Sequence, residues 1–193
     1  MTTRPLQPED PPAWAVEAVH VSAYDSRWPG RAAGYADELR PVLDQWLLGP
    51  IEHVGSTAIP GIVAKPVIDL MAQVTDPDAV VGQAGGTLGR MNWRHVPPEL
   101  DGRPWRRFFA KVSADGRHRL AHLHLMSAGT ARWDQQLRFR DALRASPALR
   151  DEYAAVKSGL ASTYADDRER YTAEKAAFVT RVMRDLDAAG GMT

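Results

Sequence analysis

Asp69 is the only charged residue in an otherwise apolar run, Val67-Ile-Asp-Leu-Met-Ala-Gln-Val74. An ionised carboxylate in the middle of a buried strand costs on the order of several kcal/mol of desolvation unless something compensates it. The carboxylate therefore faces a cleft, binds a metal ion, or pairs with a basic side chain. The first two alternatives indicate a functional site, whereas the third is a purely structural ion pair.

A short segment rich in turn-forming residues precedes this run. Gly55, Ser56 and Thr57 follow the apolar piece 51–54, which we interpret as a strand. Glycine lets a ligand approach the backbone closely, and free N–H groups followed by hydroxyls can hold phosphate oxygens. Taken alone, the three residues are equally typical of a turn. Together with Asp69, they suggest a phosphate group held at the loop and a metal ion held at the carboxylate.

His122 and His124 are two residues apart in an expected strand, so their imidazoles lie on the same face. Such a pair binds a metal ion, moves a proton, or forms hydrogen bonds within the sheet. His53, just before the turn, is a further candidate ligand if its strand is a neighbour of theirs. Imidazole ligands favour Mn²⁺ or Zn²⁺, whereas a carboxylate also suits Mg²⁺.

Basic side chains near these elements could neutralise phosphate charge. The candidate phosphate-binding residues of this kind are Lys65, Lys111, Arg119 and Arg140. Lys157 and Lys175 lie on expected helices as well. Most helical charges belong to solvated faces, so we expect only two or three of these cations to point inward.

The surrounding sequence predicts alternating strands and helices in a single domain, with an α/β (α+β) fold. The expected strands cover residues 51–54, 67–74, 105–112 and 119–126, and a turn at 114–116 joins the last two as a hairpin. The expected helices cover 30–48, kinked or split by Pro41, a segment that Asp76 caps, and 130–145, 146–164 and 172–188. We expect a flexible leader at 1–16, then one domain at 17–189 whose part from 130 to 189 is helical.

Composition limits the classes of partner. Twenty-four basic residues balance 24 acidic ones, whereas proteins that bind nucleic acid usually carry a basic excess. There are no cysteines, which excludes disulfides and thiol chemistry. No run approaches the roughly 20 apolar residues of a membrane span, and the N-terminus lacks the features of a signal peptide. We expect a cytoplasmic protein with no membrane partner.

The longer motif His53-Val-Gly-Ser-Thr-Ala-Ile-Pro-Gly-Ile-Val-Ala-Lys-Pro-Val-Ile-Asp69 resembles the signature of the GrpB family. Other segments resemble it too: the Tyr-Asp…Trp-Pro opening within 21–29, Arg107-Phe-Phe-Ala-Lys111, Arg119-Leu-Ala-His-Leu-His124, Phe139-Arg-Asp-Ala-Leu-Arg144, and the Tyr153…Lys157 and Tyr171…Lys175…Phe178 spacings. The resemblance covers roughly residues 19–185.

The resemblance implies a nucleotidyltransferase (polymerase-β-like) fold, in which helices flank a small mixed sheet and a helical region follows. In active enzymes of that fold a Gly-Ser turn holds the nucleotide phosphates, here Gly55 and Ser56. Two alternating acidic residues of one strand bind two metal ions, and a further acidic residue comes from another strand. Asp69 matches the first acidic position, but Met71 occupies the second. His122 and His124 stand in a plausible place for the third.

Two functions follow from this pattern. The first is a metal-dependent nucleotidyltransferase that acts on a small-molecule acceptor, with Asp69 as metal ligand and His122 or His124 as metal ligand or general base. The alternative is a catalytically degenerate module that binds a nucleotide or a phosphometabolite. Domains of this family also occur joined to dephospho-CoA kinase, so the alternative would suit an accessory role related to CoA.

Overall fold

A computed structural model describes residues 11–17, 21–163 and 168–190. Its centre is a five-stranded mixed sheet in the order β1-β2-β5-β4-β3. The strands are β1 (Glu52–Val54), β2 (Ile68–Val74), β3 (Trp93–Val96), β4 (Arg107–Val112) and β5 (Arg119–Ser127). Strands β2 and β5 are parallel, whereas the other neighbouring pairs are antiparallel. The central strands are therefore far apart in sequence and adjacent in space.

Two helices cover one face of the sheet, which we call the core face. They are α1 (Trp28–Leu43) and α2 (Pro77–Arg90). Their apolar side chains pack against alternate residues of the central strands, such as Leu70 and Leu123, in the largest hydrophobic cluster. Asp76 caps α2, because its Oδ1 accepts hydrogen bonds from the N–H groups of Asp78 and Ala79.

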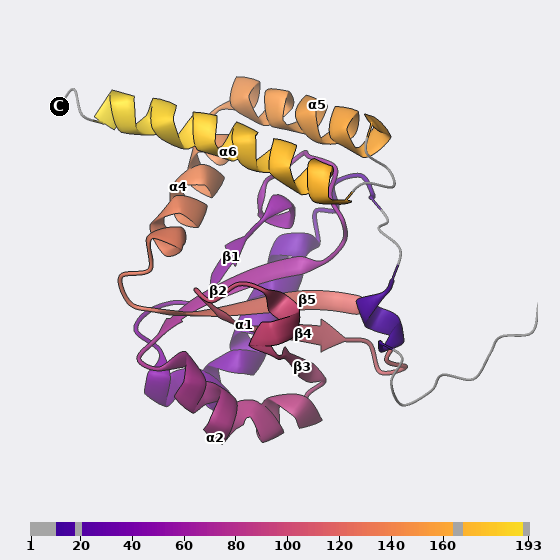
Figure 1. The fold of residues 1–193 in the computed structure, drawn as a ribbon, viewed down its shortest axis with the longest axis vertical. Coiled ribbons are helices and arrows are strands. Elements are labelled where there is room, and N and C mark those ends of the chain that lie inside the picture. Colours follow the sequence, from indigo (N-terminus) through magenta and orange to yellow (C-terminus); the bar gives the residue numbers. More distant parts are fainter. Residues whose placement is uncertain (1–10, 18–20, 164–167, 191–193) are drawn as a thin grey trace, which may run out of the picture.

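The C-terminal helices lie at the β1 edge of the sheet (Figure 1), and the first of them packs over the opposite face, which we call the cleft face. They are α4 (Ala131–Ala145), α5 (Pro147–Thr163) and α6 (Arg168–Gly190), and the short α3 (Pro98–Asp101) lies beside β4. A separate hydrophobic cluster, which includes Leu143, Tyr153 and Phe178, joins the three long helices to the loop after β1. In the described part of the chain, no helix has the length and apolarity to cross a bilayer.

Most of the expected elements are present. The mixed sheet flanked by helices and the C-terminal helical region are confirmed. Pro41 lies in the last turn of α1, after which the chain continues as a 3₁₀ helix at Asp44–Trp46. Sequence analysis missed β3 and α3. The expected end of α5 near residue 164 and residues 1–10 of the expected leader lie outside the described residues. Within the rest of that leader, Ala13–Ala15 form a 3₁₀ helix, and the domain boundaries stay a prediction.

Candidate functional site

The turn after β1 lies directly against the carboxylate of Asp69. Gly55 has φ +70° and ψ −170°, a conformation that is essentially restricted to glycine. A Cβ atom at this position would lie 2.3 Å from Oδ2 of Asp69. The turn needs glycine for both reasons, and the close approach brings the expected phosphate loop and the expected metal ligand into one site.

Two imidazoles of β5 lie close to Oδ1, the other oxygen of this carboxylate. Nδ1 of His122 lies 2.8 Å from Oδ1 of Asp69, and Nε2 of His124 lies 3.6 Å from the same atom. The parallel register, which pairs Asp69 with His122, places all three side chains on the cleft face. Nε2 of His122 is buried and has no hydrogen-bond partner among the described residues.

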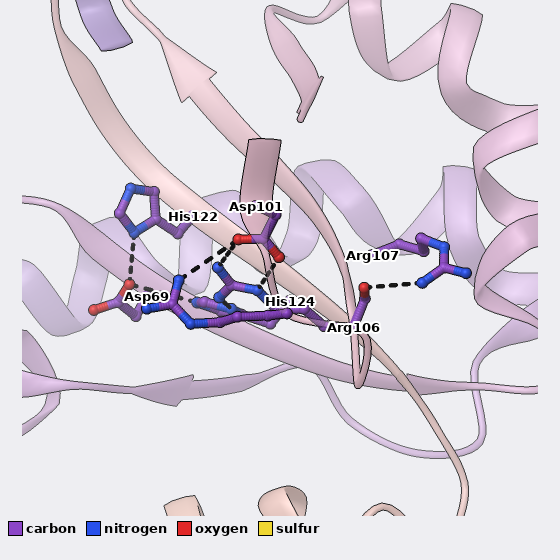
Figure 2. A network of polar contacts seen from close by, with 7 residues as sticks. Asp69, Asp101, Arg106, Arg107, His122 and His124 are labelled. Carbon is purple, nitrogen blue, oxygen red and sulfur yellow. Dashed lines mark hydrogen bonds and ion pairs between the residues drawn. The ribbon is translucent and has the colours of Figure 1, made fainter. Parts of the chain in front are cut away.

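A buried ion pair extends this network beyond His124 (Figure 2). Arg106 donates from Nη1 to Nδ1 of His124, and its Nε and Nη2 donate to the two carboxylate oxygens of Asp101 at 2.9 and 2.6 Å. The side chains of Arg106 and Asp101 are each 5% exposed. Because a guanidinium has no acceptor, Nδ1 of His124 must accept. The neutral ring therefore carries its proton on Nε2 and donates it toward Asp69.

The charges follow from these contacts. Burial alone would raise the pKa of Asp69, but the hydrogen bonds from His122 and His124 outweigh it and hold that pKa well below its usual range. Burial lowers the pKa of His124 to about 4, although its hydrogen bond to Asp69 acts in the opposite direction, and the charge of Arg106 lowers it further. At neutral pH the site thus holds an ionised carboxylate beside a neutral His124.

The donor set fits a divalent ion. Asp69, His122 and His124 each present a ligand atom, and these atoms lie within 4.8 Å of one another. One carboxylate with two imidazoles suits Mn²⁺ or Zn²⁺ better than Mg²⁺, which prefers oxygen ligands. The contact from Arg106 opposes metal binding by His124. An ion on Nε2 of His124 requires the ring proton to be on Nδ1, but Nδ1 accepts a hydrogen bond from Arg106 in this structure.

A lysine of α5 reaches the phosphate loop from the helical side. Nζ of Lys157 donates to Oγ of Ser56 at 3.0 Å and to the carbonyl oxygen of Val63 at 2.8 Å, and the residue is 7% exposed. Burial lowers the pKa of Lys157 to about 8, and the positive charge of Lys175 lowers it further. The loop therefore has a cation in direct contact with its hydroxyl.

Some of these groups line a cleft of about 280 Å³ between the sheet and the helices α4, α5 and α6. Gly55, Ser56 and Asp69 form its floor on the sheet side. Phe139, Leu143 and Tyr153 supply an apolar part, and the cationic side chains in the lining are Arg103, Arg132, Arg140 and Lys175. Asp69 is the single carboxylate among the lining residues, so the cleft favours anionic ligands.

The structure brings some of the predicted site residues together and leaves others apart. Gly55, Ser56, Asp69 and Arg140 line the cleft, with both histidines of β5 against Asp69. Arg140 also ties α4 to β1, because its Nη1 donates to Glu52 at 2.6 Å and to the carbonyl oxygen of His53 at 3.0 Å.

Seven predicted residues do not line the cleft: His122 and His124, which lie against Asp69, and His53, Thr57, Lys65, Lys111 and Arg119. His53 pairs in register with Leu70, so its side chain is on the core face, where Nε2 contacts Oγ1 of Thr57 at 3.0 Å. Lys111 is also on the core face, in an ion pair with Glu38. The backbone N–H of Arg119 donates to Glu17, and Lys65 lies in the loop before β2.

Other residues of the site were missed as candidates. Lys157 and Lys175 were noted only as helical cations, while Arg103, Arg106, Asp101 and Arg132 were not considered as candidates. The arginines and Asp101 come from a loop, from α3 and from a helix start that only the tertiary fold brings to Asp69. The one available signal is that the first turn of α4 carries an arginine, which opposes the helix dipole.

Met71, at the position where the resemblance leads one to expect a second acidic residue, is part of a hydrophobic cluster. Met71 lies two residues beyond Asp69 on the cleft face and is buried with Val54 and Met126. Trp133 and Leu137 of α4 pack against this cluster. The described site therefore offers one carboxylate rather than two.

Comparison with known proteins identifies relatives over most of the chain. The family model described as GrpB protein matches residues 18–185. A UPF0157 protein of Pseudomonas aeruginosa is 39% identical over 171 residues, which cover 86% of this chain and 67% of that protein. A dephospho-CoA kinase of Mycobacterium leprae is 27% identical over 175 residues, which cover 78% of this chain and 42% of the kinase.

Solved structures support the same assignment. The conserved protein GrpB from Enterococcus faecalis matches with a TM-score of 0.74 and 27% identity, over 86% of this chain and 96% of that one. Cid1, in complex with its short product ApU, matches with a TM-score of 0.51 and 12% identity, over 72% of this chain and 42% of Cid1. The Cid1 likeness concerns the fold alone, which is nucleotidyltransferase-like. The chain belongs to the GrpB family.

Proposed function

We propose that this chain is a metal-dependent nucleotidyltransferase that acts on a small-molecule acceptor. The observation that carries the proposal is the contact between the Gly55-Ser56 turn and the carboxylate of Asp69 at the floor of one cationic cleft. A phosphate-binding turn and a metal-binding carboxylate must be this close if one ligand is to use both. The resemblance of the fold to Cid1, which was solved with a dinucleotide product, supports the same reaction class.

In this proposal the phosphates of the donor bind at the turn. The hydroxyl of Ser56 and the backbone N–H groups beside it donate to phosphate oxygens. Lys157 already contacts that hydroxyl, and its pKa of about 8 leaves it mainly charged at neutral pH. Lys175, which also lines the cleft, adds a second positive charge. Both lysines would stabilise negative charge that develops on the leaving pyrophosphate.

Asp69, His122 and His124 would hold the divalent ion, which when bound supplies charge neutralisation at the reacting phosphate. The two imidazoles differ as proton acceptors. Nδ1 of His124 is occupied by Arg106 and its pKa is about 4, so it is a weak base at neutral pH. His122 donates from Nδ1 to Asp69, which leaves the lone pair of its Nε2 without a partner in the described structure. Of the two imidazoles, His122 is therefore the better candidate to receive the acceptor's proton in the alternative arrangement in which it does not bind the ion, because a metal-bound imidazole has no lone pair left to accept a proton.

The substrates in this proposal are a nucleotide and a small molecule in the cytoplasm. The balanced net charge speaks against a nucleic-acid polymer as the acceptor, since polymer binding depends on a basic excess.

The second candidate function is a module that binds a nucleotide or phosphometabolite without turnover. Met71 favours it, because its apolar cluster occupies the place of the second metal-binding carboxylate. The similarity to part of a dephospho-CoA kinase would make a CoA-related accessory role the first to examine.

Calorimetry and thermal shift with ATP, GTP, CTP, UTP and CoA precursors would test both functions, each with Mg²⁺, Mn²⁺ or no metal. We expect metal-dependent binding of one nucleotide by the wild type, loss of that binding in Asp69→Ala, and no change in Asp37→Asn, whose carboxylate is exposed on α1. Turnover of an α-³²P-labelled nucleotide then separates the two functions. Binding without any metal and without transfer would support the module, whereas no response to any nucleotide would contradict both.

A further inference from the structure

Three arginines gather at the end of the cleft that lies beyond His124. Arg106 and Arg103 both contact Asp101, the first at 2.6 Å and the second at 3.5 Å. The third, Arg132 in the first turn of α4, donates from Nη1 to the neutral side chain of Gln135 at 2.5 Å. Arg103 and Arg132 line this end of the cleft, whereas the Arg106–Asp101 ion pair is buried beside it and is not part of the lining.

The positive charge is concentrated around Trp105. The guanidinium carbons of Arg106 and Arg132 lie 5.1 and 5.6 Å from the centre of its ring, and the same ring stacks on His124 with a centroid distance of 6.4 Å. Burial lowers the pKa of Arg132, and the charges of Arg103 and Arg106 lower it further. The arginines therefore repel one another, and an anion bound between Arg103 and Arg132 would relieve that repulsion.

Arg132 is also poorly placed for the stability of its own helix. The N-terminal turn of a 15-residue helix carries a partial positive charge, which favours acidic rather than basic side chains. Local choices that oppose the fold tend to occur at functional sites. Arg103 and Arg132 both line the cleft, so their charge is directed to the same space that Asp69 faces.

This cationic end is well separated from the phosphate turn. Across the sheet the order is Gly55 after β1, Asp69 on β2, the histidines on β5 and Arg106 before β4. Asp69 and the ring of His124 lie between the Gly55 turn and the guanidinium of Arg106. Asp69 lies between them, so the two cationic ends serve two different ligand groups.

We propose that Arg103 and Arg132 form a second anion subsite, which binds a carboxylate or phosphate group carried by the acceptor. The identification with an acceptor rests on the proposed transferase function, whereas the subsite itself does not. Guanidinium groups bind both kinds of oxyanion through paired N–H donors. The acceptor would be held by its anionic group on one side of Asp69, and the nucleotide phosphates would be held on the other.

The test is a titration of the full chain with sodium phosphate and, separately, with sodium succinate, at constant ionic strength. The side-chain Nε–H signals of the arginines are followed by NMR and assigned through Arg103→Gln and Arg132→Gln. We expect saturable shifts of the Arg103 and Arg132 signals with at least one anion. The affinity should fall about tenfold or more in either variant, as the loss of a charge-assisted hydrogen bond predicts. Arg184→Gln, whose side chain is 75% exposed on α6, should bind like the wild type.

Lys157→Met separates this subsite from the phosphate turn. It should leave the titration of the Arg132 signal unchanged, because Lys157 contacts the turn instead. If phosphate binding were lost in Lys157→Met and unaffected by Arg132→Gln, the second subsite would be refuted. The subsite would also be refuted if the NMR signals of Arg103 and Arg132 shifted linearly with anion concentration, by the same amount as the signal of Arg184. Arg132-dependent anion binding in a protein that binds no nucleotide would support the subsite and contradict the transferase.

Discussion

Replacing Gly55 by alanine tests whether the phosphate turn and the carboxylate of Asp69 are in direct contact. The backbone of Gly55 has φ +70° and ψ −170°, and imposing that conformation on alanine costs about 1–3 kcal/mol. The new methyl group would also lie 2.3 Å from Oδ2 of Asp69. If the carboxylate moves to avoid the methyl group, it loses its hydrogen bond from His122. Such a bond contributes about 1.5–3 kcal/mol to stability because one partner is charged.

We therefore expect Gly55→Ala to lower the free energy of unfolding by about 3–6 kcal/mol. In an Asp69→Ala background the carboxylate is gone, and only the backbone cost and a milder contact with Cβ at 3.1 Å remain. The double variant should thus be more stable than the sum of the single changes predicts, by about 2 kcal/mol, within the range measured for residues in contact.

Urea-induced unfolding of the wild type, the two single variants and the double variant measures this coupling. Gly61→Ala is the matched control, because Gly61 also has a positive φ of +83° but a Cβ there would have no atom within 4 Å. Its effect should add to that of Asp69→Ala within about 0.5 kcal/mol. If Gly55→Ala were equally additive, the contact between the turn and the carboxylate would not exist in solution.

Three further predictions concern buried ionisable side chains. For Lys157 the folded-state pKa of about 8 lies below its ordinary value of 10.5, so the unfolded chain binds more protons between these pH values. The stability of the wild type relative to Lys157→Met should therefore rise from pH 8 to 10.5, by about 3 kcal/mol in denaturant titrations. Burial likewise lowers the pKa of His53 from 6.5 to about 4. The unfolded chain therefore binds a proton at His53 at a higher pH than the folded protein does. The free energy of unfolding of the wild type, relative to that of His53→Asn, should fall as the pH drops from 6.5 to 4. If this difference did not change with pH, His53 would not be buried. Arg106→Leu leaves the Asp101 carboxylate buried and should cost about 3–5 kcal/mol. Adding Asp101→Leu should recover most of that loss in the same unfolding assay, and no recovery would show that the ion pair is not the cause.

The elements whose sequence patterns are long and regular could be predicted from the sequence. The apolar run around Asp69 is a central strand, and the turn at 114–116 joins the two strands of a hairpin, as expected. Strand β3 was missed because it has four residues and lies between Asn92, with φ +62°, and Pro97. Such a short segment carries too few alternations to distinguish it from a loop.

For the site, residue spacing within one strand was informative and register between strands was not. The i, i+2 spacing of His122 and His124 placed both rings on one face, which is the face of Asp69. Lys111 was expected at the site, but it pairs with Ala121 and its side chain is on the core face, a register that cannot be read from its own strand. No local pattern shows that Lys157 is buried, since a lysine on a helix is usually solvated.

The packing of Met71 determines which side chains this position can hold. An acidic residue there would bury a charge among Val54, Met126 and Trp133, which is strongly destabilising unless the charge is paired or binds an ion. A second carboxylate at this position therefore requires compensating changes on β1, β5 and α4. A single substitution of Met71 is not a route to a two-carboxylate centre in this chain.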